Sequence, residues 1–486
     1  MKRLLRVAHV LGLVIAVFGL GMVLPILVAF IYDNNDAARA VFVEAMGETI
    51  ACGLLMWLGT RRYRADLQVR DGFLLVVLVW TVLPVFAALP LLRFLPGLSI
   101  TDAYFECMSG VTTTGATVLT GLDTLPPSIN VWRAELVWLG GMALIVLAVA
   151  ILPLLGVGGR QMFKAETPGP MKEARLIPRI TETARGLWII YAGISLACLL
   201  SYHLAGMGWL DALIHTFSTI GLGGFSSHDQ SYRYFDSPAI EAVAIVFMII
   251  AGMNFATHFT VFRNWDVEPY RDDPEAGWFV FITVASIFGI GTYLWAEGAY
   301  DGLATALRYA SFNTVSIATT TGFASTDYNT WPVFAPMWML FLSSFVSCSG
   351  STGGGIRMIR AMLLYKQVFH EMVRTVHPNA ISPIKLARHP VPNNVVFAVL
   401  AFALVYVALI VVMTLALTAL GLDAVSAFTA IVACINNTGP GLSQVGPATT
   451  YAVLTDLQTW VCSAAMLLGR LELFTVLVVL TPSFWR

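Results

Sequence analysis

The chain has 486 residues, of which 57% are hydrophobic and 12% are charged. Because soluble globular domains carry about 25% charged residues, this composition excludes an ordinary soluble protein and indicates an all-α protein that crosses a membrane many times. The formal net charge of −1 gives no reason to expect nucleic-acid binding. The six cysteines lie in or beside apolar stretches, without a CxxC pair or a histidine cluster, so neither a disulfide framework nor a zinc site is expected.

The hydropathy pattern predicts ten membrane-spanning helices. The first follows MKRLLR, and its apolar run is long enough to cross a membrane and lacks a clear small-residue cleavage site. We therefore interpret it as a retained helix and not as a signal peptide. Eight spans are free of charge, at 11–32, 73–92, 136–159, 186–210, 242–262, 276–296, 333–356 and 395–422. Two others, near 38–60 and 451–480, contain charged residues.

Lys and Arg residues gather on one side of these spans. Of the 28, 22 lie at the N-terminus, in the loops at 61–70, 160–185, 263–271 and 357–388, and at Arg486. Because positively charged loops stay in the cytoplasm, the sequence predicts a multi-pass protein with both termini cytoplasmic.

Four connections on the opposite side share an unusual composition. Each begins with a semi-apolar stretch of about 12 residues, too short to cross a membrane, and runs into Thr, Gly or Asn. The segments are DAYFECMSGVTTTGAT (102–117), DALIHTFSTIGLGGFS (211–226), LRYASFNTVSIATTTGFAS (307–325) and SAFTAIVACINNTGPG (426–441). Aligned on Gly115, Gly224, Gly322 and Gly439, they recur at intervals of 109, 98 and 117 residues. This predicts four repeats of span, short re-entrant helix, extended loop and span, against the alternative of ordinary polar hairpin loops.

The loops after the short helices have the composition of an ion filter. Non-helical backbone survives at membrane depth only where protein or water satisfies it, and Gly permits a positive φ that turns carbonyls to one side. Four such loops around one axis would form a ring of carbonyl oxygens for a monovalent cation, with the negative ends of the short helices facing it. The predicted filter residues are Thr112, Thr113, Thr114, Gly115, Gly221, Leu222, Gly223, Gly224, Thr319, Thr320, Thr321, Gly322, Asn436, Asn437, Thr438 and Gly439.

The stretch SCSGSTGGGIR (347–357) interrupts the span at 333–356. Each of its three consecutive glycines disfavours helix by roughly 1 kcal/mol relative to Ala. We interpret the stretch as a movable plug beneath the filter, and the alternative is a helix end near the cytoplasmic face. The predicted gate residues here are Ser349, Gly350, Ser351, Thr352, Gly353, Gly354 and Gly355.

Arg470 is a further predicted gate residue, because it is the one cation that falls inside a span. A charge at the centre of a spanning helix is costly and suggests a function. We favour an Arg that points into the pore below the filter as an electrostatic barrier. The alternative is a structural ion pair, for which Glu472 is poorly placed because residues two apart do not share a helix face.

The remaining polar residues in the four segments have simpler interpretations. Asp102 and Asp211 stand near the start of two short helices and are expected to cap them. His215 is expected to be packed or hydrogen-bonded, with a proton relay as the less favoured alternative. No HExxH, GxSxG or Walker sequence occurs, so no enzymatic activity is predicted.

Several stretches carry a family resemblance: TTTGAT, STIGLGGFS, ATTTGF, CINNTGPGL, WLGGMALIVLAVAILPLLGVGG, AETPGP and CSGSTGGGIR. With the four repeats they cover nearly the whole chain, which resembles TrkH-type subunits of bacterial Trk potassium uptake systems, within the Trk, Ktr and HKT superfamily. The two extra N-terminal spans favour the TrkH pattern. One departure is Leu222, where a small or hydroxylated residue is expected, and it matters little if only its carbonyl lines the filter.

The resemblance implies potassium uptake across the bacterial inner membrane through a channel-like, gated pore, with K+ as the transported ion and no cofactor. It also implies a homodimer of pseudo-fourfold pores in membrane lipid and a cytosolic nucleotide-binding regulatory subunit. The predicted units are an N-terminal helix pair at 1–66 and pore repeats at 67–175, 176–272, 273–388 and 389–486.

The alternative function is a secondary transporter that couples potassium to protons or sodium. Such a transporter usually needs buried carboxylates near the midplane. The predicted spans contain few acidic residues, namely Glu44, Glu48, Asp456 and Glu472.

Overall fold

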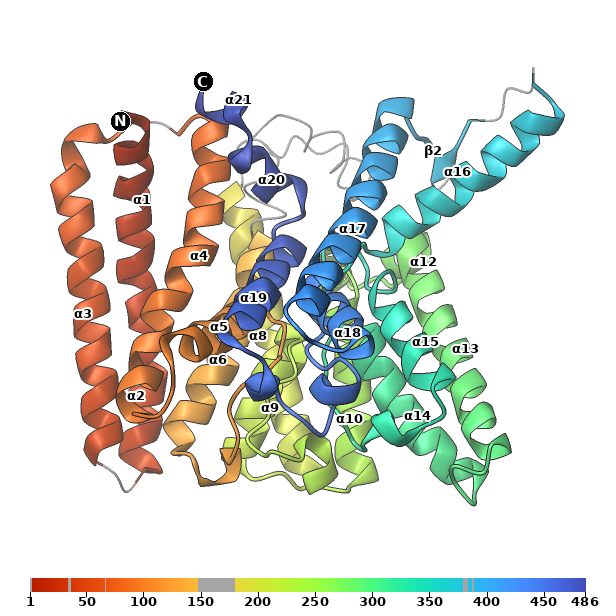
Figure 1. The fold of residues 1–486 in the computed structure, drawn as a ribbon, viewed down its shortest axis with the longest axis horizontal. Coiled ribbons are helices and arrows are strands. Elements are labelled where there is room, and N and C mark those ends of the chain that lie inside the picture. The colour runs from red at the N-terminus through yellow and green to blue at the C-terminus, as the bar shows by residue number, and fades with distance from the viewer. Residues whose placement is uncertain (1, 34–35, 66, 147–179, 379–382, 387–388) are drawn as a thin grey trace.

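The structure is a computed structural model that describes residues 2–33, 36–65, 67–146, 180–378, 383–386 and 389–486 (Figure 1). It is built from helices, and its described strands, β1 (Lys385–Leu386) and β2 (His389–Pro390), form one antiparallel pair. The two ends of the chain lie at the same end of the molecule.

Six helices in the described residues are long and apolar enough to cross a membrane. They are the continuous run of α1 (Lys2–Gly19), η1 (Leu20–Met22) and α2 (Val23–Ile31), then α3 (Asp36–Thr60), α4 (Val69–Phe94), α8 (Ile180–Leu204), α13 (Pro274–Ala296) and α17 (Asn393–Ala419). All six correspond to predicted spans. α1 packs along α3, and their glycines Gly12 and Gly53 let the two backbones approach closely.

Two predicted spans are bent helix pairs. α10 (Pro238–Gly252) meets α11 (Phe255–Asn264) at 96°, and α19 (Asp456–Arg470) meets α20 (Phe474–Leu480) at 114°. The predicted span 333–356 is helical only over α15 (Phe334–Ser343). The predicted span 136–159 coincides in part with α6 (Pro127–Val146), while residues 147–159 and most of the predicted loop 160–185 lie outside the described residues.

Four short helices lie among these long ones: α5 (Ile100–Val111), α9 (Trp209–Gly221), α14 (Leu303–Ala318) and α18 (Ala424–Ile435). Their C-terminal halves are buried. Each packs against a helix of the preceding unit in a closed order, α9 on α6, α14 on α10, α18 on α15 and α5 on α19. Segments far apart in the sequence therefore meet around one centre.

The starts of the short helices correct one expectation. Asp102 and Asp211 are not caps, because the residues before the helices are Ser99 and Gly208 and each Asp stands three residues later. Ser99 accepts from the backbone N–H of Asp102 and donates to its carboxylate at 2.8 Å. Among the four short helices, α18 is the one that an aspartate, Asp423, caps.

The remaining elements are short or peripheral. α16 (Met358–Val376) extends away from the body of the molecule (Figure 1). The others are α12 (Glu268–Asp272), α21 (Pro482–Trp485), η2 (Arg61–Tyr63), η3 (Leu122–Thr124), η6 (Ser231–Tyr234), η7 (Tyr328–Thr330), η8 (Ser443–Val445) and η9 (Tyr451–Val453).

Candidate functional site

The four short helices end in the same way. A residue in the left-handed region follows each helix, at Thr113, Leu222, Thr320 and Asn437, with φ between 53° and 62°. The next residue donates its backbone N–H to the carbonyl five positions earlier, at 2.8 to 3.0 Å. This is the Schellman end, which a glycine usually occupies because other residues are strained there.

The loops that follow, at 112–115, 221–224, 319–322 and 436–439, are here called glycine loops one to four. At each aligned glycine, an added Cβ would lie closer than 3.0 Å to backbone of the next glycine loop. Gly115 meets Gly224, Gly224 meets Gly322, Gly322 meets the residue before Gly439, and Gly439 meets the residue before Gly115. The four loops thus close a ring, and no side chain fits at its contacts.

The Thr side chains of loops one and three repeat one arrangement. The hydroxyls of Thr112 and Thr114 lie 2.8 Å apart, as do those of Thr319 and Thr321. In loop four, Asn437 donates instead to the hydroxyl of Thr114 at 2.9 Å. One amide therefore joins the last loop to the first.

Two other side chains of the ring, those of Asn436 and Leu222, pack among surrounding elements. Asn436 accepts from the hydroxyl of Tyr406 and donates to those of Ser343 and Ser344. Leu222, the departure noted above, is fully buried in an apolar cluster. Its side chain is therefore accommodated away from solvent.

The loop between α15 and α16, residues 344–357, lies against three of the four glycine loops or the helix ends before them. Thr352 donates its hydroxyl to the carbonyl of Ile220 at 3.0 Å, and Gly354 donates its N–H to the hydroxyl of Thr320 at 2.9 Å. An added Cβ on Gly354 would collide with the carbonyl of Asn436. The predicted gate residues of this loop are therefore neither helical nor a surface turn, since all except Gly350 and Gly355 are fully buried.

Contacts with α10, α11 and α13 hold the other side of this loop. Glu275, at the start of α13, accepts from the N–H of Ser349 at 2.8 Å. Phe255 donates its N–H to the carbonyl of Gly350, and Cys348 donates to that of Gly252. Sequence reasoning missed Glu275, although an acidic residue at the start of an apolar span was a signal.

Arg470 lies at a different position from that expected. It is the last residue of α19, at the bend before α20, and not at a helix centre. Its side chain is buried and donates to the carbonyls of Thr352 at 2.9 Å and Gly140 at 3.2 Å. Glu472 pairs with Arg360 at 3.0 Å, so the ion-pair alternative for Arg470 does not describe this structure.

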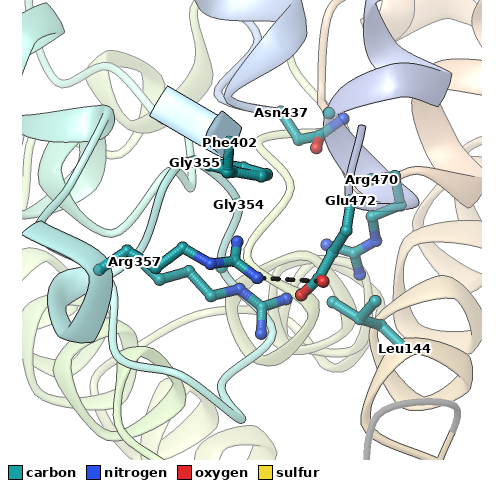
Figure 2. A pocket seen from close by; sticks show the side chains of 11 residues that line it. Leu144, Gly354, Gly355, Arg357, Phe402, Asn437, Arg470 and Glu472 are labelled. Carbon is teal, nitrogen blue, oxygen red and sulfur yellow. Dashed lines mark ion pairs between the residues drawn. The ribbon is translucent and has the colours of Figure 1, made fainter. Parts of the chain in front are cut away.

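A small pocket lies beside this arrangement (Figure 2). The side chains of Arg357, Arg470 and Glu472 point toward one another across it. Gly353, Gly354 and Gly355 form part of its wall. The guanidinium groups of Arg357, Arg360 and Arg470 and the carboxylate of Glu472 also line it.

On the far side of the ring, His228 joins two carboxylates. Its Nδ1 is hydrogen-bonded to Asp123 and its Nε2 lies 3.4 Å from Asp211, while its ring stacks on Tyr234. Burial opposes the charged imidazole, but the neighbouring carboxylates of Asp211 and Asp123 outweigh it and raise the pKa of His228. The pKa of Asp123 is lowered, because its bond to His228 outweighs its own partial burial.

The fold and site together define a class: a polytopic membrane protein with polar, non-helical backbone enclosed at the depth of its spans, an arrangement suited to ion transport. A family model described as TrkH, "Cation transport protein", matches residues 38–295 and 298–485. The chain belongs to this family, which confirms the resemblance seen in its motifs.

Known relatives cover the chain from end to end. It is 46% identical over 482 residues to the "Trk system potassium uptake protein TrkH" of Halomonas elongata, and 44% identical over 482 residues to that of Escherichia coli K12, with 99% of each chain covered. Its structure matches the crystal structure of the potassium transporter TrkH from Vibrio parahaemolyticus with a TM-score of 0.91 and 44% identity. That match covers 99% of this chain and 100% of the other.

Proposed function

We propose that this protein carries potassium into the bacterial cell across the inner membrane, through a gated, K+-selective pore. The observation that carries the proposal is the closed ring of four glycine loops, each following a buried short helix. The names of the relatives give the ion, since they are potassium uptake proteins and a potassium transporter.

The proposed architecture has ten spans, with a helix pair at 1–66 followed by pore repeats at 67–175, 176–272, 273–388 and 389–486 around one axis. The six long helices, the two bent pairs, α6 and α15 supply candidates for all ten. Cytoplasmic termini are supported by the Lys and Arg distribution and by the location of both chain ends on one side (Figure 1).

The sixteen residues of the glycine loops are the proposed filter. Backbone carbonyls can replace the water shell of K+, and the short helices direct their negative C-terminal ends toward the same centre. Positive φ at Gly115, Gly322 and Gly439 supports this role, because it lets the chain turn without a side chain in the ring.

The loop at 349–355 together with Arg470 is the proposed gate. Its hydrogen bonds to Ile220, just before glycine loop two, and to Thr320 of glycine loop three support a closed plug directly beside the filter. Arg470 adds a charge that repels cations, a hydrogen bond that holds the plug at Thr352 to α19, and a second hydrogen bond that joins α19 to Gly140 of α6. Opening must break these contacts.

For assembly, we propose a homodimer in membrane lipid and a cytosolic nucleotide-binding regulatory subunit. The word "system" in the relatives' names supports further subunits. The positive loops on the predicted cytoplasmic side offer a surface for an acidic partner, although anionic lipid would also fit them.

Proton or sodium coupling is the second candidate function. It is favoured by Glu135, which is buried in α6 and whose Oε2 has no hydrogen-bond partner among the described residues. A buried carboxylate within a membrane protein is a candidate for proton transfer. This residue was not among the carboxylates considered from the sequence.

Ion flux in proteoliposomes tests both candidates. Purified protein should pass K+ and Rb+ and exclude Na+, at a rate set by the K+ gradient alone. Uphill K+ accumulation driven by an imposed pH or Na+ gradient would instead establish coupling. Absence of any K+ flux from folded protein, with regulatory factors supplied by a cytosolic extract, would contradict the proposed function.

A further inference from the structure

Behind each glycine loop, a side chain from the preceding short helix holds the extended segment that leaves the loop. This side chain is here called the brace, and the extended segment is called the strand. In three loops the brace accepts the backbone N–H three residues after the aligned glycine. The donor–acceptor pairs are Val118 to Glu106 at 2.9 Å, Ser325 to Asn313 at 3.2 Å, and Leu442 to Thr429 at 3.0 Å. In loop two His215 bonds the hydroxyl of Ser226 at 3.0 Å, and that hydroxyl accepts the N–H of His228.

These bracing residues occupy matching positions but differ in chemistry. Glu106, His215 and Asn313 each stand nine residues before the aligned glycine, and Thr429 stands ten before it. The ring nitrogen Nδ1 of His215 lies 2.8 Å from the carbonyl of Asp211, so it is the donor, and Nε2 then accepts from Ser226. Glu106 is the only carboxylate among the four bracing residues.

Glu106 is balanced by Arg133 of α6. Both side chains are 1% exposed, and the guanidinium lies 2.8 Å from the carboxylate. Thr117 donates its hydroxyl to Glu106 and receives a bond from Arg133 at 3.2 Å. The pair therefore encloses the strand that leaves glycine loop one.

Arg133 also reaches the second loop. Its Nη1 donates to the carbonyl of Ser226 at 3.3 Å, and its guanidinium stacks on the ring of Phe225 with 4.3 Å to the centroid. Ser226 is the same residue whose hydroxyl His215 holds. The ion pair and the histidine brace thus converge on one strand.

We propose that Glu106 and Arg133 are positioning residues that set the spacing between glycine loops one and two and thereby tune ion selectivity. The proposal rests on the assignment of the glycine loops as the filter. A carbonyl ring discriminates between K+ and Na+ through the placement and number of its oxygens. A bonded network that fixes two of the four strands therefore acts on discrimination without touching the ion.

The experiment measures the K+ to Na+ flux ratio per folded molecule in proteoliposomes. Glu106→Gln keeps an acceptor for Val118 but removes the charge that holds Arg133. We expect the ratio to fall by between about threefold and about tenfold, as for loss of a coupled network. Arg133→Gln should lower it similarly, and the double variant should be no worse than either single one, because the two residues act as a unit.

Glu241→Gln is the matched control, since Glu241 of α10 is also a buried carboxylate paired with an arginine, Arg308 at 2.8 Å, and lies outside the proposed filter and gate. It should leave the ratio within twofold of wild type. If Glu106→Gln does not fold, Thr117→Val serves instead, because it keeps both charges and removes the hydroxyl between them. A smaller fall in the ratio is expected for it, and an unchanged ratio would overturn the proposal.

Two results separate this proposal from the filter assignment. If Gly439→Ser changes the flux ratio and folded Glu106→Gln does not, the filter stands and the brace fails. If neither variant changes the ratio, the glycine loops are not the filter, and the assumption beneath the brace is wrong. Lower thermal stability of Glu106→Gln with an unchanged ratio would indicate a purely structural ion pair.

Discussion

The glycine loops and the α15–α16 loop are both irregular, buried and rich in Gly, but they are held in different ways. Each glycine loop is bonded to its own short helix, through the Schellman bond and the brace behind the strand. The α15–α16 loop is instead tied to α9, α10, α11, α13, α19 and glycine loop three, by one or two bonds each. Several bonds to one neighbouring helix favour a rigid segment. A segment held by few bonds to each of several helices can detach from them as a unit.

The largest effect is expected from Gly322→Ala. Its φ of +89° costs any other residue about 1–2 kcal/mol, and the new Cβ would collide with the carbonyl of Thr438, which adds about 1–3 kcal/mol of overpacking. Selectivity should be lost in whatever protein still folds, as measured by the K+ to Na+ flux ratio.

Gly298→Ala is the control that separates strain from collision. Gly298 has a φ of +72° but open space around its Cβ position. It should lose some thermal stability and keep the wild-type flux ratio. Equal ratios in the two variants would show that the glycine loops are not a rigid ring around the ion.

The second prediction concerns Arg470→Ala, which should raise K+ flux. At a few ångströms and an effective dielectric near 20, the guanidinium repels a cation by about 4 kcal/mol, and water in the pore should reduce the effect to about tenfold in rate. Arg470→Lys should retain most of the barrier, because the charge remains. Flux per folded molecule, with folding checked by size-exclusion chromatography, provides the measurement.

Arg93→Ala is the control for Arg470. Arg93 also carries a positive charge, but it pairs with Glu44 and Glu48 on the surface of the helix bundle. Its loss should leave flux unchanged. A well-folded Arg470→Ala protein with flux equal to or below wild type would refute the barrier.

The third prediction tests a single tie of the α15–α16 loop. Thr352→Val keeps the shape of the side chain and removes the bond to the carbonyl of Ile220, worth about 1 kcal/mol. Basal K+ flux should rise by about twofold to fivefold with selectivity retained. Thr418→Val, whose hydroxyl bonds only within α17, should behave as wild type, and a change of selectivity in Thr352→Val would place the loop inside the filter.

The contrast between the two regions also explains what the sequence could predict. The glycine loops follow local rules, so an alignment of the sequence on Gly115, Gly224, Gly322 and Gly439 located them. The left-handed residues and the ring contacts occur at matching positions of this alignment. Hydropathy likewise located the long helices.

What could not be predicted depends on distant contacts. The acceptors of Arg470 are 118 and 330 residues away in the chain, and the bend that puts it at a helix end leaves no mark in hydropathy. Glu106 and Arg133 are 27 residues apart, so each looks like an isolated charge near an apolar segment. The fold, and not the local pattern, brings them together.

The smallest effect is expected from pH, at the clasp between His228 and Asp123. The pKa of His228 is raised in the folded protein, so its contribution to stability is complete below its unfolded value near 6.5 and is lost as pH rises through the folded value. The pKa of Asp123 is lowered, so its contribution is present above about 3.9 and is lost as pH falls through the folded value. The clasp is therefore complete between about pH 4 and about pH 6.5.

Because the groups are partly exposed, the effect on Tm should be only a few degrees. His228→Gln should remove the decline in Tm above pH 6.5, while His377→Gln, at an exposed position, should preserve it. If Tm declines equally above pH 6.5 in both variants, another group titrates. The contact between the segments that follow glycine loops one and two would then depend on Arg133 and not on His228.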